Sequence, residues 1–305
     1  MIQVYIDKFI ENLPDNIKNN DKPIIIDLVL DGGAFNGSYQ IGALYFLKEM
    51  EKLNYIKINR ISGASIGSVI GFFSFLDKLD LASELYESTK NNFKKKYNLK
   101  IVKNLKTILK DHVPENFYLT VNNKLFISYH NVEKCKKVIQ SKYNNNDELF
   151  EAIIKSCFVP HLIDGNLLYE NKYMDGILPY VFKQKNDNKI LYLNILSYNK
   201  IFNTLNIKNE KSNYHRILTG LIDIHNFFIK GSNTDMCSYV DKWSILNKSI
   251  RCFQLILEQI VVYIMYLYIN LKKYILKENN LNVFLKPLKK LHRELVKMIL
   301  KQYFV

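Results

Sequence analysis

Glycine is unevenly distributed in this chain, and its distribution constrains the fold more than any other feature. Of the 11 glycines among 305 residues, seven lie between Gly32 and Gly71. Glycine concentrates where the backbone takes a positive φ angle, or where it passes close to a ligand or a neighbouring helix. We therefore expect the functional chemistry of the chain within this stretch.

The sequence around these glycines predicts alternating strands and helices. Ile24–Leu30 is a short apolar run rich in β-branched residues, which is typical of a buried parallel strand, and Ile56–Ile61 predicts a second one. Apolar residues recur at helical spacing over Ser38–Leu53, and Val69–Leu81 is again helix-like. The order strand, glycine loop, helix, strand, tight turn, helix predicts a βαβα unit of a mostly parallel sheet, and so an α/β fold.

Four parts of the chain differ in composition. We expect an N-terminal arm over residues 1–23, an α/β domain over 24–200, a connecting segment over 201–239, and a basic, apolar helical region over 240–305. The remaining periodic segments predict strands at 124–129 and 190–196 and helices at 84–111 and 149–157.

Positive charge is concentrated in two segments. The formal net charge is +14, with +10 in residues 90–142 and +8 in residues 240–305, whereas residues 1–89 carry −4. Such segments indicate an anionic partner, either lipid headgroups or nucleic acid. The abundance of Lys, Asn, Ile and Tyr also fits the codon usage of an AT-rich genome, which could by itself produce the excess of lysine.

The C-terminal region contains a long apolar stretch. Cys252–Leu271 has twenty residues with one charge, Glu258, and is bounded by Arg251 and by Lys272 and Lys273. The stretch is long enough to span a bilayer. Its glutamines, asparagine and tyrosines also suit a helix docked on the protein, or one that lies in a membrane interface, so all three interpretations stay open.

The cysteines and the N-terminus bear on location. The four cysteines form no CxxC pair and have no close histidine partner, so neither a zinc site nor a redox motif is predicted; they are Cys135, Cys157, Cys237 and Cys252. Free thiols, and an N-terminus without a basic and apolar signal segment, predict an intracellular, cytoplasmic protein. The basic segments and the apolar stretch lead us to expect that it is peripheral at membranes, with a transmembrane tail as the less favoured alternative.

Gly63–Gly67 has the pattern G-x-S-x-G, with Ser65 at its centre. The pattern can form a strained strand-to-helix turn, in which the glycines permit the tight backbone and the serine hydroxyl is exposed. At a helix N-terminus the helix dipole also favours an alkoxide or an oxyanion. The pentapeptide alone is unspecific, but the strand before it and the apolar helix after it are the context that a nucleophile requires.

The loop Asp31–Gly37 joins the first predicted strand to the first predicted helix. A loop of this kind turns several backbone N–H groups toward one point, where they form a cradle for an anion. In a nucleotide-binding protein that anion is a phosphate, and beside a serine nucleophile it is the oxyanion of a tetrahedral intermediate. The loop has no Walker lysine, which disfavours the nucleotide-binding interpretation.

Six histidines follow Ser65, and four of them are considered as candidates for a Ser-Asp-His triad: His161, His215, His225 and His292. An α/β-hydrolase places its nucleophile after several strands, whereas Ser65 follows only the second predicted strand, so an esterase of that type is the weaker alternative. No histidine pair has metal-ligand spacing, and no metal is expected.

Four blocks of sequence, taken together, resemble the patatin-like phospholipase family. Gly32–Gly42 resembles the family signature G-G-G-x-K/R-G-x-Y-x-x-G, and the G-x-S-x-G pattern at Ser65 follows on the next strand. Ala152–Pro160 resembles A-x-x-A-S-x-x-x-P, and Tyr173–Gly176 resembles the Y-x-D-G-G/A block. The blocks occur in the family's order and cover roughly residues 24–200, so together they are far more specific than any one of them.

The resemblance implies a three-layer α/β/α patatin-like fold with a mostly parallel central sheet, followed by a helical C-terminal tail. It implies a Ser–Asp dyad, with Ser65 as nucleophile and with Asp175, which Gly176 follows, as general base. By spacing alone, an Asp–Gly pair is more often a turn. The implied nucleophile turn is flanked by Gly63 and Gly67, and the implied oxyanion hole is formed by Gly32, Gly33, Ala34, Asn36 and Gly37.

Three residues of the glycine-loop block and the acid block depart from the family pattern. Ala34 stands at the third glycine, Asn36 at the usual Lys or Arg, and Ile177 at the usual Gly or Ala of the acid block. Alanine keeps its N–H group, so a donor survives unless φ must be positive there. Loss of the cation at position 36 would weaken oxyanion stabilisation or phosphate recognition.

The sequence therefore predicts a metal-independent lipid acyl hydrolase without a cofactor. Its expected substrate is a phospholipid or another acyl ester, in lipid catabolism or remodelling, and its expected partner is an anionic membrane surface and not nucleic acid. One alternative is a catalytically weakened or inactive protein of the same fold that binds membranes, and another, less favoured, is the α/β-hydrolase-type esterase.

Overall fold

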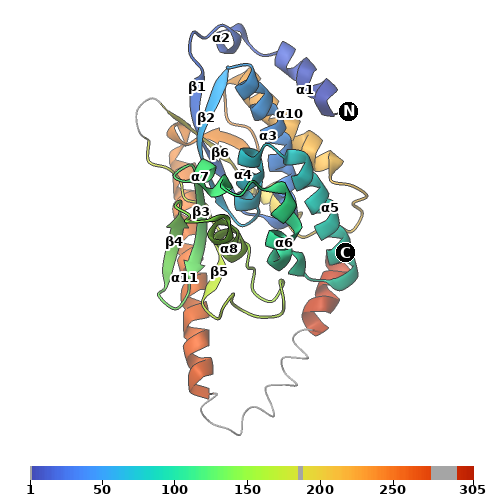
Figure 1. Ribbon diagram of the computed structural model, residues 1–305, viewed down its shortest axis with the longest axis vertical. Coiled ribbons are helices and arrows are strands. Elements are labelled where there is room, and N and C mark those ends of the chain that lie inside the picture. Colours follow the sequence, from blue (N-terminus) through green and yellow to red (C-terminus); the bar gives the residue numbers. More distant parts are fainter. Residues whose placement is uncertain (1, 185–187, 276–293) are drawn as a thin grey trace.

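The computed structural model describes residues 2–184, 188–275 and 294–305, so His292 and residues 276–293 of the expected C-terminal region lie outside the described residues. The strands are β1 Ile24–Leu30, β2 Ile56–Ala64, β3 Leu125–Asn131, β4 Lys136–Gln140, β5 Tyr173–Asp175, β6 Lys189–Leu193 and β7 Cys237–Tyr239. In the described part they form one sheet in the order β4-β3-β2-β1-β6-β7, and β5 pairs with β3 off this path (Figure 1). The four central strands β3, β2, β1 and β6 are parallel, and the other three are antiparallel to their partners.

Helices connect and cover these strands. They are α1 Ile2–Glu11, α2 Asp15–Lys18, α3 Gly37–Lys52, α4 Ile66–Leu76, α5 Leu79–Lys96, α6 Leu105–Leu109, α7 Phe117–Val121, α8 Asn146–Ser156, α9 Tyr198–Ile201, α10 Tyr214–Lys230 and α11 Ile245–Ile275. Residues 294–303 are also helical. The predicted strands, and the helices predicted at 38–53 and 149–157, are confirmed to within three residues at each end.

The apolar run 69–81 differs from its prediction as a single helix. Helix α4 ends at Leu76, because Asp77 takes the left-handed conformation with φ 56°, and its N–H group caps the carbonyl groups of Phe73 and Ser74. A left-handed residue after the last helical turn ends a helix in this way. The expected helical segment 84–111 is likewise interrupted, since Tyr97 ends α5 with φ 52°.

Strand β1 lies between two apolar layers. Leu28 and Leu30 belong to the main core with residues of α3 and α4, whereas Val29 packs on the opposite face with Phe182 and Tyr192. Helices α3, α4 and α10 cover the first face, and residues 177–184 with α11 cover the second. The domain is thus a three-layer α/β/α fold with a mostly parallel sheet, as expected.

Helix α10 was not predicted, and it crosses α3 with the two backbones in contact. A Cβ on Gly42 would lie 1.9 Å from the carbonyl oxygen of Ile217, and a Cβ on Gly220 would lie 1.9 Å from that of Tyr39. Only glycine fits at both crossing points. Residues 201–239, expected to be a connecting segment, therefore supply a core helix, and they also supply the edge strand β7.

Helix α11 contains the long apolar stretch of the sequence. Over Ile245–Leu271 it is long and apolar enough to cross a membrane, and 11% of its most apolar window is buried in the protein. Figure 1 shows its C-terminal half extending beyond the sheet. The helix is therefore docked along one narrow side, while most of its apolar side chains remain exposed.

Candidate active site

Ser65 occupies the sharp turn between β2 and α4. Its backbone has φ 51° and ψ −127°, and such a conformation costs a non-glycine residue about 1–3 kcal/mol unless the surroundings impose it. A Cβ on Gly63 would lie 2.5 Å from the backbone of Gly67, and a Cβ on Gly67 would lie 2.4 Å from the carbonyl oxygen of Leu30. The turn therefore needs both glycines of the G-x-S-x-G pattern.

The glycine loop after β1 lies against Ser65. A Cβ on Gly32 would lie 3.4 Å from the Ser65 Cβ and 2.8 Å from the carbonyl oxygen of Ile177, so side-chain atoms have no room there. At Gly37, which begins α3, a Cβ would lie 2.3 Å from the Ile66 side chain. Glycine at these positions brings the loop and α3 into contact with the serine turn.

Backbone N–H groups of this loop differ in their availability. The Gly32 N–H donates to Asp31 Oδ1 at 3.1 Å. In the described residues no acceptor is paired with the N–H of Gly33 or Ala34. Ala34 has φ 40°, so the alanine in place of the third family glycine does adopt the left-handed conformation. Two unpaired donors therefore remain in the loop beside the serine.

Asn36 is fully buried and positions the loop. Its amide group donates to two backbone carbonyl oxygens, those of Ile195 and Lys200, both at 2.9 Å. Its Oδ1 accepts from Arg216 Nη1 of α10 at 2.7 Å, and Arg216 also pairs with Glu210. Because both amide hydrogens are engaged by these carbonyl groups, Asn36 has no free donor for an oxyanion, contrary to the expectation above.

Asp175 ends the short strand β5, which β3 holds in place with Tyr129 opposite Asp175. Its Oδ1 accepts the Ile177 N–H at 2.7 Å, and its Oδ2 is buried and has no hydrogen-bond partner of good geometry among the described residues. Burial raises the pKa of Asp175 to about 6, and of the influences that lower this pKa the neighbouring Ser65 side chain is the largest. A carboxylate in this position is suited to accept a proton from the serine near neutral pH.

Ser156, at the end of α8, links the serine turn to the acid turn. The Ser65 N–H donates to Ser156 Oγ at 2.9 Å, and Ser156 Oγ donates to the carbonyl oxygen of Ser128 at 2.7 Å. The Ser156 carbonyl oxygen accepts the Gly176 N–H at 3.2 Å. A Cβ on Gly176 would lie 2.0 Å from the Ser128 carbonyl oxygen, so glycine is required there. We did not identify Ser156 from the sequence as a site residue, although it is the serine of the block Ala152–Pro160.

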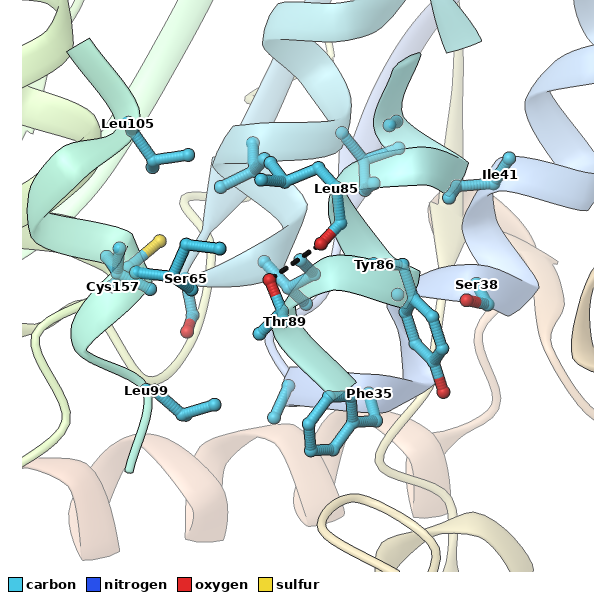
Figure 2. A pocket seen from close by; sticks show the side chains of 18 of the residues that line it. Phe35, Ser38, Ile41, Ser65, Leu85, Tyr86, Thr89, Leu99, Leu105 and Cys157 are labelled. Carbon is cyan, nitrogen blue, oxygen red and sulfur yellow. Dashed lines mark hydrogen bonds between the residues drawn. The ribbon is translucent and has the colours of Figure 1, made fainter. Parts of the chain in front are cut away.

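An apolar pocket of about 760 Å³, open mouth included, lies beside Ser65. Its walls come from α3, α4, α5 and residues 99–105. Figure 2 shows Ser65 on one side of the pocket and Tyr86 on the other. In the α5 wall the Thr89 hydroxyl donates to the Leu85 carbonyl oxygen at 2.7 Å and the Tyr86 hydroxyl donates to Glu210 Oε1 at 2.6 Å, which leaves that wall without a free donor. The pocket is therefore suited to a long apolar chain next to a serine hydroxyl.

The C-terminal residues cover one side of this pocket. Leu300 is buried in a cluster with Phe35, Tyr86 and Leu99, three residues that also line the pocket. The Phe304 carbonyl oxygen accepts a backbone N–H at 2.9 Å from the loop before α10. The last helix therefore supports the pocket wall from outside.

The candidate triad histidines that the structure describes, His161, His215 and His225, do not line this pocket. His225 stacks on Phe9 with ring centroids 4.3 Å apart, and His215 lies near the start of α10. In the part of the chain that the structure describes, no histidine borders the Ser65 pocket, and no group of three or more His, Cys, Asp or Glu side chains could hold a metal ion.

Two buried carboxyl groups predict how stability depends on pH. Burial raises the pKa of Asp31 to about 7 and that of Asp175 to about 6, from 3.8. Between about pH 4 and about pH 7 the folded protein therefore holds protons that the unfolded chain releases, so the free energy of unfolding falls as the pH rises. Urea titrations across this range are expected to show that fall, and Asp31→Asn should make it shallower. A slope that is the same in wild type and Asp31→Asn would contradict the assignment to Asp31.

Comparison with known proteins identifies the family of this domain. Residues 28–178 match the family model of patatin-like phospholipases. These residues form a patatin-like phospholipase domain. The matched part of the patatin-like domain contains Ser65 and Asp175 and ends at Leu178. Members of this family generally act on the acyl groups of lipids, which fits the apolar pocket.

Two similar proteins are omega-hydroxyceramide transacylases. The one from Mus musculus is 30% identical over 139 residues, which are 42% of this chain and 23% of that protein. The one from Homo sapiens is 26% identical over 136 residues, which are 42% of this chain and 26% of that protein. The similarity to this patatin-like domain therefore spans about a quarter of the length of these relatives.

Proposed function

We propose that this protein is a metal-independent serine hydrolase of lipid acyl esters, with Ser65 as nucleophile and Asp175 as general base. One observation carries the proposal: a buried carboxyl group lies beside a serine that is held in a strained turn at an apolar pocket. A histidine is not needed, because a carboxylate near the hydroxyl can accept its proton directly.

The reaction would proceed in two halves. Asp175 takes the proton of Ser65 Oγ while that oxygen attacks the ester carbonyl carbon, and then returns the proton to the leaving alcohol as the acyl–oxygen bond breaks. In the second half, Asp175 takes a proton from water, which attacks the acyl-enzyme, and the proton returns to Ser65 as the fatty acid leaves. The sum is one ester and one water converted into one acid and one alcohol.

Backbone donors of the glycine loop would stabilise the oxyanion that forms in both halves. The N–H groups of Gly33 and Ala34 are the unpaired ones. They lie at the start of a short 3₁₀ turn, Ala34–Asn36, close to Ser65. Fixed donors of this kind are among the largest contributions to catalysis in acyl transfer.

The substrate class that we propose is a membrane phospholipid or a related acyl lipid. The pocket offers an apolar surface for an acyl chain. The basic segments 90–142 and 240–305 would attract an anionic lipid surface. Each Lys or Arg near such a surface contributes about 1 kcal/mol, screened over about 8 Å at physiological salt.

Labelling with a fluorophosphonate probe and hydrolysis of esters of different acyl length test this function. We expect one covalent adduct at Ser65, and a kcat/KM that rises with acyl length. Leu85→Trp, which fills the pocket, should lower activity on long-chain esters and spare acetyl esters, whereas Ile108→Trp at an exposed site outside the pocket should change neither. Absence of labelling and of turnover in a folded protein would instead support a catalytically inactive membrane-binding protein.

Acyl transfer to an alcohol is a second candidate. It is favoured by the transacylase activity of the two relatives and by the scarcity of polar groups in the pocket, which disfavours water. The acceptor hydroxyl would take the place of water in the second half of the reaction. Addition of a long-chain alcohol should then convert the product from free acid to ester, and an unchanged yield of acid would support hydrolysis alone.

A further inference from the structure

Helix α11 has two faces of opposite character. Arg251, Glu258 and Val262 are buried and lie on one side of the helix, since they are seven and four residues apart. Between Cys252 and Leu271 the only charged side chain is Glu258, which is 2% exposed. Most of the other side chains of this stretch are apolar and exposed, with Phe253, Ile256, Ile260, Tyr263, Ile264, Leu267 and Leu271 each more than 40% exposed.

Glu258 connects this helix to the acid turn. Its Oε1 accepts the Leu178 N–H at 3.2 Å, and it pairs with Lys137 at 2.8 Å. Lys137 in turn donates to the Leu178 carbonyl oxygen at 2.6 Å. Leu178 follows Ile177, which has φ 50° and donates its N–H to Asp175 Oδ1. The helix therefore holds the strained turn that orients the Asp175 carboxyl group.

Arg251 connects the same helix to the glycine loop. Its guanidinium donates to the Tyr192 hydroxyl at 3.0 Å and to the Pro179 carbonyl oxygen at 2.8 Å. Tyr192 is hydrogen-bonded to Asp31, whose Oδ1 accepts the Gly32 N–H. One helix is thus linked to both parts of the candidate site, directly through the buried Glu258 and by way of Tyr192 through the buried Arg251.

We propose that α11 is a bilayer-contacting helix, and that lipid contact with its apolar face stabilises the arrangement of the Ser65 site. This inference rests on the proposed function. Lipid contact and the site are linked by the rotation of α11 about its own axis. A charged side chain in hydrocarbon is unfavourable, so a bilayer around the exposed side of the helix keeps Arg251 and Glu258 turned toward the protein. In water the same apolar face is exposed, and nothing outside the protein favours that orientation. Lipid therefore binds the competent arrangement better than any other, which is the condition for activation.

The exposed face fits a lipid phase better than a protein groove. Exposed apolar side chains occupy several sides of the helix and continue for about 30 Å at 1.5 Å per residue. Three tyrosines, Tyr263, Tyr266 and Tyr268, lie in the second half of the apolar stretch Cys252–Leu271, and Lys272 and Lys273 follow this stretch directly. Aromatic and basic residues at the end of an apolar helix are typical of a membrane interface.

The experiment uses the full chain and its own cysteine. Cys252 is exposed on the apolar face, so an environment-sensitive NBD label placed there in the Cys135→Ser background reports contact with lipid. Vesicles of ether-linked phosphatidylcholine and phosphatidylglycerol cannot be hydrolysed, and they would serve as activator only. Turnover is measured on a soluble short-chain ester, with and without the vesicles. We expect a blue shift of NBD emission and an increase in kcat of about tenfold, within the range of known couplings between sites.

Two sets of variants separate the binding of vesicles from the effect of that binding on kcat. The double variant Ile256→Glu, Ile260→Glu should lose the NBD shift and the stimulation and keep the basal turnover, whereas Ile229→Glu, an exposed site on α10, should behave as wild type. Glu258→Gln should keep the NBD shift and the KM but lose most of the increase in kcat. Should Glu258→Gln fail to fold, because Lys137 loses its charged partner, Arg251→Gln tests the second link by the same measurements.

The possible failures are distinguishable. An NBD signal that ignores vesicles overturns the lipid contact, and a shift that depends on protein concentration without lipid identifies a second copy of the chain as the occupant. Binding without any increase in kcat, or full stimulation of a folded Glu258→Gln or Arg251→Gln, overturns the coupling. Absence of turnover by wild type under every condition contradicts the proposed hydrolase, and the NBD result then still decides the lipid contact.

Discussion

Ser65→Ala is expected to lower kcat/KM for acyl esters by at least about 10⁴-fold, because without the hydroxyl no acyl-enzyme can form. The fold should be unaffected, since alanine keeps the backbone N–H that donates to Ser156 Oγ. Hydrolysis of a chromogenic acyl ester and thermal unfolding followed by circular dichroism would measure the two effects separately.

A matched control for Ser65→Ala lies on helix α4, which follows Ser65. Ser74 is buried in α4, and its hydroxyl has no hydrogen-bond partner among the described residues. Ser74→Ala should therefore leave kcat/KM unchanged. If Ser65→Ala retained wild-type turnover, or if Ser74→Ala lost as much activity, Ser65 would not be the nucleophile.

Asp175→Asn is expected to lower kcat/KM on the order of 10³–10⁴-fold, because the amide can take up no proton from Ser65. In the wild type, activity should rise with pH around the pKa of about 6, since only the ionised Asp175 acts as a base. A pH–rate profile of the wild type would show this rise in activity, and the residual activity of Asp175→Asn should not rise over the same pH range.

The same substitution is expected to stabilise the protein above pH 7. Asp175 has a raised pKa, so its contribution to stability is fully present below about pH 4 and is lost as the pH rises through about 6. The neutral amide avoids that loss, worth up to about 3 kcal/mol for a shift of this size. Loss of activity combined with a higher urea midpoint at about pH 8 would separate a catalytic role from unfolding.

The double variant Ser65→Ala, Asp175→Asn tests whether the two residues act as one unit. The activity of the double variant should be no lower than that of the less active single variant, because each change already removes the same attack of Ser65 on the ester. A double variant that loses the product of the two single factors would show that Ser65 and Asp175 act independently.

Much of the first third of the fold could be predicted from sequence. Strand β1, helix α3 and strand β2 are marked by local patterns of apolar residues, and the G-x-S-x-G turn is marked by the two glycines that its geometry requires. Burial and helical spacing are properties of neighbouring residues, so a window of about 11–18 residues contains the information.

The acid side of the site could not be predicted from local pattern. Strand β5 has three residues, and it exists because β3 pairs with it. Without the family resemblance, Asp175 is one more Asp–Gly pair in a long irregular segment. The interaction of Asn36 with Arg216 could not be predicted from local pattern either, since 180 positions separate the two residues.

The sequence by itself determined the α/β alternation, the strained serine turn and the glycine loop, because each depends on residues within a few positions of one another. Only the tertiary structure decided that Asn36 is engaged by Arg216, that Ser156 links the two turns, and that Glu258 of an apolar helix reaches the Asp175 turn. These contacts join residues far apart in the chain, and a buried polar group accepts whichever partner the packing brings to it. The single charge in the apolar stretch is therefore one of the two points, with Arg251, at which α11 is attached to the site.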